Sequence, residues 1–384
     1  MKPNRCWPPG TGGTGCDQPA RTGGGAAARE LLTLPQDLWT ARDTTPDDVE
    51  AALRNLVRRA HATDETLAPA RVLNLVVVIE ARWQELIGQR LAAVGRYHAS
   101  RTVLCTVHDG RDTLDATAAI SYEEIRNGIG VVLEQVEIDI GQEHLDFIDT
   151  IVDPVIISEL PTVLWCPRGP DEVINRLMRL TDVILLDSDD QPEPGEALHR
   201  ADQLLDSAYV VDLAWLRTTP WRERVAASFD PPWRRPALDQ IAEISVRHQG
   251  RSRASALLWA GWIASRLHWD PAPLRAPARG GGLEGKAARP ETEVGVKLEP
   301  TEMPTPGLAG VTLACEDGFS LSLDRAAGGL CAHRRSPDGH KATWKVLGAS
   351  RGEGGILGEG VRQALLRDPT YGPALDAARE FCPG

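Results

Sequence analysis

The sequence lacks a long uninterrupted apolar run. Its longest candidate, Ala254 to Ala264, has eleven residues, whereas a transmembrane helix needs about 20. No apolar stretch follows Lys2 and Arg5 at the N-terminus, so we predict no secretory signal. The seven cysteines are odd in number and without paired spacing, which is typical of a reducing compartment. We therefore expect a cytoplasmic protein.

The motifs of common enzymes and metal proteins are also missing. The sequence contains no G-x-x-x-x-G-K-[ST] and no H-E-x-x-H, and its nine histidines are scattered. A G-x-G-x-x-G pattern at 10–15 has no strand pattern before it and no helix pattern after it, as a dinucleotide site would require. A G-x-S-x-G pattern at 348–352 has no histidine after Ser350 to complete a triad. We therefore expect no catalytic residue, cofactor or metal.

Two polar clusters are weaker candidates for a ligand site. Residues 187–190 (DSDD) follow a predicted buried strand at its carboxyl end, where α/β folds bind ligands. The alternative there is a solvated turn. Tyr97, His98 and Arg101 lie between a predicted helix and a strand, with a histidine satisfied by backbone groups as the alternative. A nucleophile, a base and an orienting group cannot be assembled from these residues.

Composition restricts the class of protein. A net charge of −12 argues against a nucleic-acid binder, which would present a basic face. Apolar and charged contents of 42% and 25% are ordinary for a globular protein. A length of 384 residues predicts two domains.

The order of strand and helix patterns predicts the fold. Over 44–270 the two patterns alternate, which indicates an α/β domain whose mostly parallel sheet is flanked by helices. Within it, Val72 to Ile79 is a near-continuous β-branched run, typical of a strand that is buried on both faces. The helix predicted over 255–269 is apolar nearly all round, so we expect it to be buried.

The remaining segments differ in composition. Residues 1–43 are rich in Gly and Pro and are predicted to be a disordered extension. Residues 271–304 are predicted to be mostly a Pro/Gly-rich linker, with an edge strand over 293–299 as an alternative. Residues 305–384 contain hairpin turns and alternating apolar residues, which predict a small antiparallel β-meander domain with C-terminal helices.

Residues 209–235 concentrate tryptophan and arginine. A helix is predicted from Thr219 as N-cap and Pro220 as its first residue to about Phe229, where Asp-Pro-Pro ends it. One face of this helix is apolar, and residues 222–224 (RER) are expected on the other.

Three interpretations of this segment remain open: core tryptophans with a solvated arginine rim, a protein interface, and a phosphate-binding or catalytic arginine cluster. Trp and Arg dominate binding hot spots. The candidates for a partner interface are Trp215, Arg217, Trp221, Arg222, Arg224 and Trp233.

Three long blocks, at 72–104, 136–167 and 209–235, together resemble the OpcA family of glucose-6-phosphate dehydrogenase assembly proteins. The resemblance extends over about 44–380. It implies a non-enzymatic protein, without cofactor, that binds glucose-6-phosphate dehydrogenase and activates it allosterically in the oxidative pentose phosphate pathway. It also gives the segment 209–235 a role in contacting this partner or shaping the contact surface.

Two alternatives stay open beside this resemblance. One is a phosphosugar-binding enzyme or sensor that uses an arginine cluster, namely Arg217, Arg222, Arg224 and Arg247. The other is a scaffold whose target is a different enzyme.

Overall fold

The computed structural model describes residues 37–383, except 66, 70, 95–99, 126–128, 168–170, 279–280, 291, 348–351 and 365. The pattern at 10–15, His98 and Ser350 therefore lie outside the described residues, as does most of the predicted disordered segment 1–43. Its last part differs from the prediction, because Asp37–Ala41 form strand β1 and pair with a neighbouring strand. The described residues belong to one compact unit, Thr33–Gly384.

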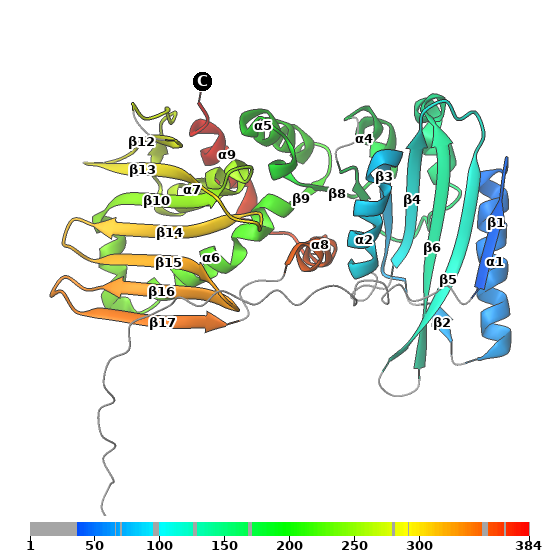
Figure 1. The fold of residues 1–384 in the computed structure, drawn as a ribbon, viewed down its shortest axis with the longest axis horizontal. Coiled ribbons are helices and arrows are strands. Elements are labelled where there is room, and N and C mark those ends of the chain that lie inside the picture. The colour runs from blue at the N-terminus through cyan, green and yellow to red at the C-terminus, as the bar shows by residue number, and fades with distance from the viewer. Residues whose placement is uncertain are drawn as a thin grey trace, which may run out of the picture. The chain divides into compact units, whose positions relative to one another are not determined.

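One sheet of this unit is mostly parallel, as predicted. The strands from β6 to β9 in the sheet order are parallel to one another, whereas β1 and β5 form an antiparallel edge next to β6 (Figure 1). Strand β3 is buried along Leu73 to Ile79, which confirms the prediction from its β-branched run. The order is β1 (Asp37–Ala41), β5 (Asp115–Ile125), β6 (Ile129–Gly141), β4 (Ser100–His108), β3 (Leu73–Glu80), β7 (Thr162–Trp165), β8 (Val183–Leu186), β9 (Tyr209–Asp212), with β2 (Ala68–Pro69) paired to β6.

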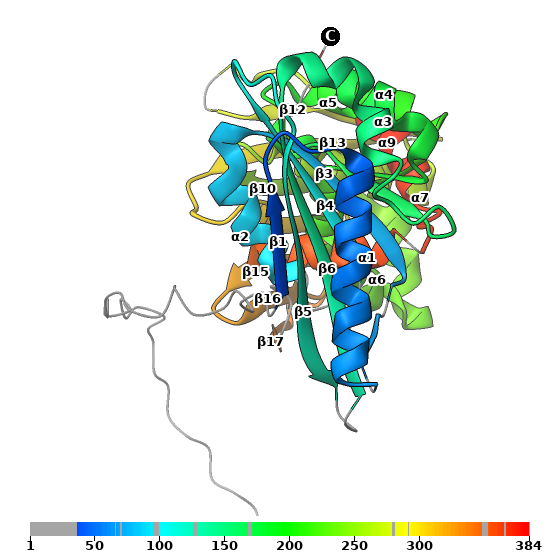
Figure 2. The same ribbon diagram turned by 90° about the vertical axis from the view of Figure 1, so that its right-hand side faces the viewer.

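Helices connect and cover these strands. Helix α1 (Pro46–Thr63) starts at an N-cap, Thr45, whose hydroxyl accepts a hydrogen bond from the Asp48 amide, and it packs on β5 and β1 (Figure 2). Helix α2 (Gln84–Val94) packs against α8 (Gly352–Gln363), which also contacts α6 (Leu213–Phe229). The other helices of this part are α3 (Ile148–Val152), α4 (Asp171–Leu177) and α5 (Pro194–Leu205).

The second sheet is mostly antiparallel. Strands β14 to β17 form the predicted meander, and β10 joins it beside β13, to which β10 is parallel. The order is β11 (Asp270–Pro271), β12 (Leu283–Arg289), β13 (Thr292–Thr301), β10 (Ile241–Gln249), β14 (Leu308–Cys315), β15 (Ser320–Ala326), β16 (Gly329–Arg335), β17 (Lys341–Leu347).

This sheet differs from the predicted domain boundaries. Most of the predicted linker 271–304 is strand, because Val294, Val296 and Leu298 alternate along β13 and are buried under a helix. Residues 241–249 fall within the predicted first domain, but they form strand β10 in the middle of the second sheet. The Gly and Pro residues around β12 and β13 concealed this alternation.

Helix α7 (Arg253–Leu267) is buried nearly all round, as predicted. It packs on β10 and β13 and against α6 and α9 (Tyr371–Glu380). Its close approach to α9 requires Gly261, since a Cβ there would lie 2.2 Å from the Ala374 carbonyl oxygen. The hydrophobic core is continuous from α1 to α9.

We predict that Gly261→Ala lowers the free energy of unfolding by about 1–3 kcal/mol or more, because the added methyl group overpacks the contact between α7 and α9. Gly88 is the matched control, since it is also helical but has open space around its Cβ position. Gly88→Ala should raise the free energy of unfolding by about 0.5–1 kcal/mol through helix propensity. Urea denaturation measures both. Equal effects of the two substitutions would contradict the close packing of Gly261.

Candidate functional site

The helix that carries the Trp/Arg segment begins earlier than predicted. Asp212 is the N-cap of α6, and its Oδ1 accepts from the Ala214 amide at 2.9 Å. Ser188 fixes this carboxylate by donating its amide at 3.1 Å and its hydroxyl at 2.6 Å. Pro220 therefore lies inside the helix, where it removes one backbone N–H, and the predicted start at Thr219 is wrong. The predicted end at Phe229 is confirmed.

Four of the six candidate interface residues are buried. Trp215, Arg217, Trp221 and Arg222 are between 1% and 9% exposed. Trp221 lies on one buried face with Val225 and Phe229, as predicted. Arg222 differs from the prediction, because it lies inside the protein and not on the solvated face. Arg224 and Trp233 are exposed, the latter 76%.

Arg222 has partners both on its own helix and on a distant segment. Its guanidinium lies 3.4 Å from the centre of the Trp215 ring, and its Nη1 is 3.8 Å from Asp368 Oδ2. Asp368 Oδ2 also accepts from Trp215 Nε1 at 2.9 Å. Burial lowers the pKa of Arg222 to about 10, against the opposing effect of Asp368. This network fixes the chain before α9 on the side of α6.

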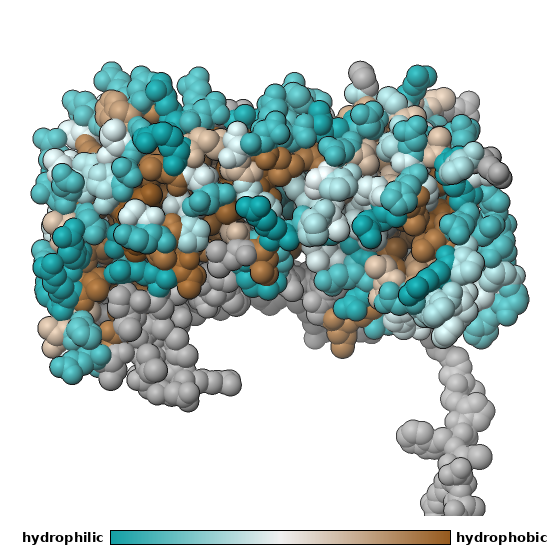
Figure 3. Space-filling view, turned by 180° about the vertical axis from the view of Figure 1, so that it is seen from behind, coloured by the Kyte–Doolittle hydropathy of each residue, from teal (hydrophilic) through white to brown (hydrophobic). Residues whose placement is uncertain are grey.

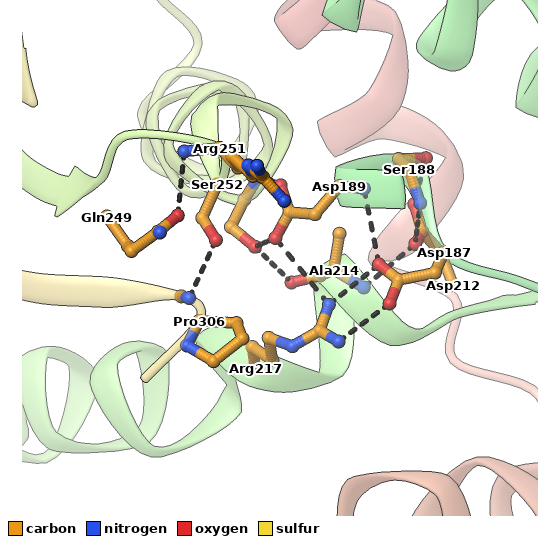
Figure 4. Close-up of polar contacts among 12 residues, drawn as sticks. Asp187, Ser188, Asp189, Asp212, Ala214, Arg217, Gln249, Arg251, Ser252 and Pro306 are labelled. Atoms are coloured by element: carbon orange, nitrogen blue, oxygen red, sulfur yellow. Dashed lines mark hydrogen bonds and ion pairs between the residues drawn. The ribbon is translucent and has the colours of Figure 1, made fainter. Parts of the chain in front are cut away.

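Arg217 belongs to a second buried network, at the carboxyl end of β8. Its two terminal nitrogens donate to the two carboxylate oxygens of Asp187 at 2.7 and 2.6 Å, and one of them lies 3.5 Å from Asp189 (Figure 4). Asp189 in turn accepts from the amide and hydroxyl of Ser255, in the first turn of α7, at 3.0 and 2.5 Å. Asp187 and Asp189 thus have partners within the protein and do not form the solvated turn considered as the alternative.

The network contains three carboxylates, and two of them, Asp187 and Asp189, lie against the Arg217 guanidinium. Burial and the negative charge of Asp187 raise the pKa of Asp189 to about 7, although Arg217 and Ser255 act in the opposite direction. Burial also raises the pKa of Asp212 to about 6. Tyr371 of α9 donates its hydroxyl to Asp212 at 3.2 Å. The network therefore joins β8, β9, α6, α7 and α9.

The arginine cluster considered as a phosphosugar site is neutralised at three of its four members. Arg217 pairs with Asp187, Arg222 lies near Asp368, and Arg247 pairs with Asp324 at 2.6 Å. Arg224 has no carboxylate partner among the described residues. The sequence could not distinguish these cases, because the acidic partners lie in distant segments.

One of the exposed candidates, Arg224, borders a hollow that the sequence did not indicate. Its volume is about 330 Å³, and it lies between the C-terminal half of α6, the short helix η5 (Pro232–Gln240) and the last strands of the second sheet. The lining residues are Arg224, Ala227, Ser228, Arg234, Leu323, Arg334, Ala342, Trp344 and Val346. We name this hollow the arginine groove.

Exposed hydrophobic side chains are spread over the surface. On the face drawn in Figure 3, hydrophobic residues gather in separate patches among hydrophilic ones. Three of the exposed side chains belong to the short helix η5 and to β17: Trp233, Trp344 and Leu347 are exposed by 76%, 37% and 77%. Trp233 follows directly on the prolines that end α6, and the other two belong to edge strand β17.

A smaller hollow of about 160 Å³ lies at the carboxyl ends of β7 and β8. It is lined by residues such as Trp165, Cys166, Ser188 and Arg200. The Ser188 hydroxyl in this lining donates its hydrogen bond to Asp212. No group of three or more metal-ligating side chains occurs among the residues that the structure describes. Within the same residues, none of the helices has the length and hydropathy needed to cross a membrane.

Two family models match the chain. Residues 92–203 match the glucose-6-phosphate dehydrogenase subunit N-terminal domain, and residues 208–375 match the corresponding C-terminal domain. The boundary between the two matches falls just before β9.

Curated cyanobacterial proteins are similar to parts of the chain. A Synechocystis sp. protein named as an OxPP cycle protein, OpcA, is 34% identical over 133 residues, which cover 34% of this chain and 28% of that protein. A Synechococcus elongatus protein of the same name is 30% identical over 184 residues, covering 46% of this chain and 41% of that protein. The matched part thus spans less than half the length of each relative.

Solved structures with a related arrangement include a UDP-N-acetylglucosamine 3-dehydrogenase from Acidithiobacillus ferrooxidans. It has a TM-score of 0.41 and 9% identity, covering 80% of this chain and 96% of that chain. An oxidoreductase from Sinorhizobium meliloti has a TM-score of 0.44 and 9% identity, covering 81% and 94%.

We predict that Arg217→Met lowers the free energy of unfolding by about 3–5 kcal/mol, because it leaves the buried carboxylates of Asp187 and Asp189 without their cation. Arg224→Met is the matched control on the same helix. Arg224 is exposed and has no carboxylate partner among the described residues, so its substitution should change the free energy by no more than about 0.5 kcal/mol. Denaturant unfolding measures both variants. Similar values for the two would show that the Arg217 network does not determine stability.

Proposed function

The chain belongs to the OpcA family of glucose-6-phosphate dehydrogenase subunits, and from this premise we propose that it is a non-catalytic partner that binds glucose-6-phosphate dehydrogenase and raises its activity. The observation that carries the proposal is the pair of family matches, which together extend from residue 92 to residue 375. Both matched domains are described as parts of a subunit of this dehydrogenase.

The polar interior supports a binding role. At the carboxyl edge of the parallel strands, Asp187 pairs with Arg217, Asp189 with Ser255, and Asp212 with Ser188. These side chains stabilise helix starts and junctions. The hydrogen-bonding groups of these side chains are directed at one another. We therefore assign the catalysed reaction to the dehydrogenase and not to this chain.

The contact surface that we propose is centred on Trp233. Trp and Arg are the residue types that contribute most to binding hot spots, because they bury a large area for a small loss of conformational entropy. Trp233 is 76% exposed, and exposed Arg224 lies on the preceding helix. The buried candidates Trp215 and Trp221 hold that helix in place.

The activation that we propose is a shift of populations. A partner that binds the active conformation or oligomer of the dehydrogenase more tightly than the inactive one raises the active fraction. It contributes no reacting group. At saturation, the equilibrium constant between the two forms changes by the ratio of the two affinities.

This function is tested by titrating the full chain into the host's glucose-6-phosphate dehydrogenase. We expect a saturable rise in rate or fall in KM for glucose 6-phosphate, together with co-elution of the two proteins. The chain alone should show no activity. An unchanged rate at every ratio without co-elution would reject the proposal, and activity of the chain alone would reject its non-catalytic part.

Within the same titration, Trp233→Ala should weaken the association at least about tenfold, as loss of a hot-spot tryptophan does. Phe147→Ala is a matched control, because Phe147 is an aromatic residue that is 46% exposed on the short helix η2 (Gln142–Phe147). It should leave the association unchanged. Since both side chains are exposed, neither substitution should unfold the protein. An unaffected Trp233→Ala variant would place the contact elsewhere.

A further inference from the structure

The arginine groove brings together three guanidinium groups from segments that are far apart in the sequence. Arg224 comes from α6, Arg234 from η5 and Arg334 from β16, and all three line the same hollow. None of them forms an ion pair with a carboxylate among the described residues, although most arginines of the networks above do. In a protein of net charge −12, such a concentration of unneutralised positive charge requires an explanation.

The three arginines line one hollow, and one of them is fixed to the end of α6. Arg234 Nη1 donates to the Ser228 carbonyl oxygen at 3.1 Å, which ties it to the last turn of α6. Desolvation and the like charge of Arg334 lower the pKa of Arg234. Like charges repel one another, and an anion bound between the guanidinium groups would relieve the repulsion.

The floor of the groove is apolar and its wall is aromatic. The register of the second sheet places Arg334 opposite Ala342, and Trp344 follows two residues later on the same face of β17. Leu323 and Val346 lie on that face as well and line the hollow. Arg335 and Lys341 point to the other face of the sheet, because successive side chains of a strand alternate.

We propose that the arginine groove binds a small organic phosphate, with its phosphoryl group between Arg224, Arg234 and Arg334 and its ring against Trp344. Guanidinium groups match the geometry of phosphate oxygens with paired N–H donors. An aromatic wall accommodates the flat or apolar side of a ring. Sugar phosphates and nucleotides share this chemistry.

The dimensions favour a small ligand over a segment of a protein. A volume of about 330 Å³ lies at the lower end of the range for small-molecule sites, which are typically apolar hollows with a few convergent polar groups. The groove has this composition: four apolar residues (Ala227, Leu323, Ala342 and Val346), one tryptophan, one serine and three arginines. The proposal does not depend on the partnership with the dehydrogenase.

The test is isothermal titration calorimetry of the full chain with ribose 5-phosphate and with adenosine 5′-monophosphate. Ribose, adenosine and inorganic phosphate serve as comparisons. We expect saturable binding of at least one phosphorylated ring, weaker binding of inorganic phosphate, and none of the two unphosphorylated compounds. The stronger of the two phosphorylated ligands distinguishes a sugar phosphate from a nucleotide as the source.

Two substitutions in the groove and one outside it test whether the binding occurs in the groove. Arg334→Gln should weaken it at least about tenfold, since a charge-assisted hydrogen bond is lost. Arg335→Gln is the matched control on the same strand and the opposite face, and it should change the affinity less than about twofold. Trp344→Leu provides a second variant if Arg334→Gln does not fold, and it should weaken binding of the phosphorylated ring more than binding of inorganic phosphate.

Three outcomes would overturn the proposal. The first is the absence of binding of either phosphorylated compound at millimolar concentration. The second is binding that Arg334→Gln and Trp344→Leu leave unchanged. The third is loss of dehydrogenase association by folded Arg334→Gln without phosphate binding by the parent chain, which would assign the groove to an acidic segment of a protein partner.

Discussion

The ion pair between Arg217 and Asp187 fixes the junction on which the arrangement of both sheets depends. Its charges are almost completely removed from water, and such charges are tolerated only when paired and hydrogen-bonded. Asp187 follows the end of β8, and Arg217 lies in the first turns of α6. Asp189 extends the network to Ser255 at the start of α7. A strand of the parallel sheet and two helices that pack on the antiparallel sheet are therefore joined at one charged cluster.

The same cluster stabilises two helix N-termini. The carboxylate of Asp212 accepts from the second residue of α6, and that of Asp189 accepts from an amide in the first turn of α7. Negative charge at these positions interacts favourably with the helix dipole. Since the starts of both helices are determined in this way, the later part of α6 is directed toward the last strands of the second sheet, where it forms one wall of the arginine groove.

Much of the fold could be predicted from local patterns. The β-branched run of β3, the all-round apolar α7 and the end of α6 at Asp-Pro-Pro all have short-range causes, and each is confirmed. The start of α6 could not be predicted, because the N-cap Asp212 is held by Ser188 and Tyr371 from other segments. The burial of Arg222 depends similarly on Asp368, which lies in a distant segment. A helical periodicity that assumes every arginine to be solvated therefore places Arg222 on the wrong face.

The candidate surface shows the same division between local and distant causes. Exposure of Trp233 follows from the prolines beside it, which end α6 and start η5. The arginine groove has no local signal, since Arg334 and Trp344 become neighbours of Arg224 only through the strand register of the second sheet. Arg217, which pairs with a distant carboxylate, is part of the core, whereas the arginines of the groove have no carboxylate partner among the described residues. The different environments of these arginines therefore depend on which of them the fold places beside an acidic residue.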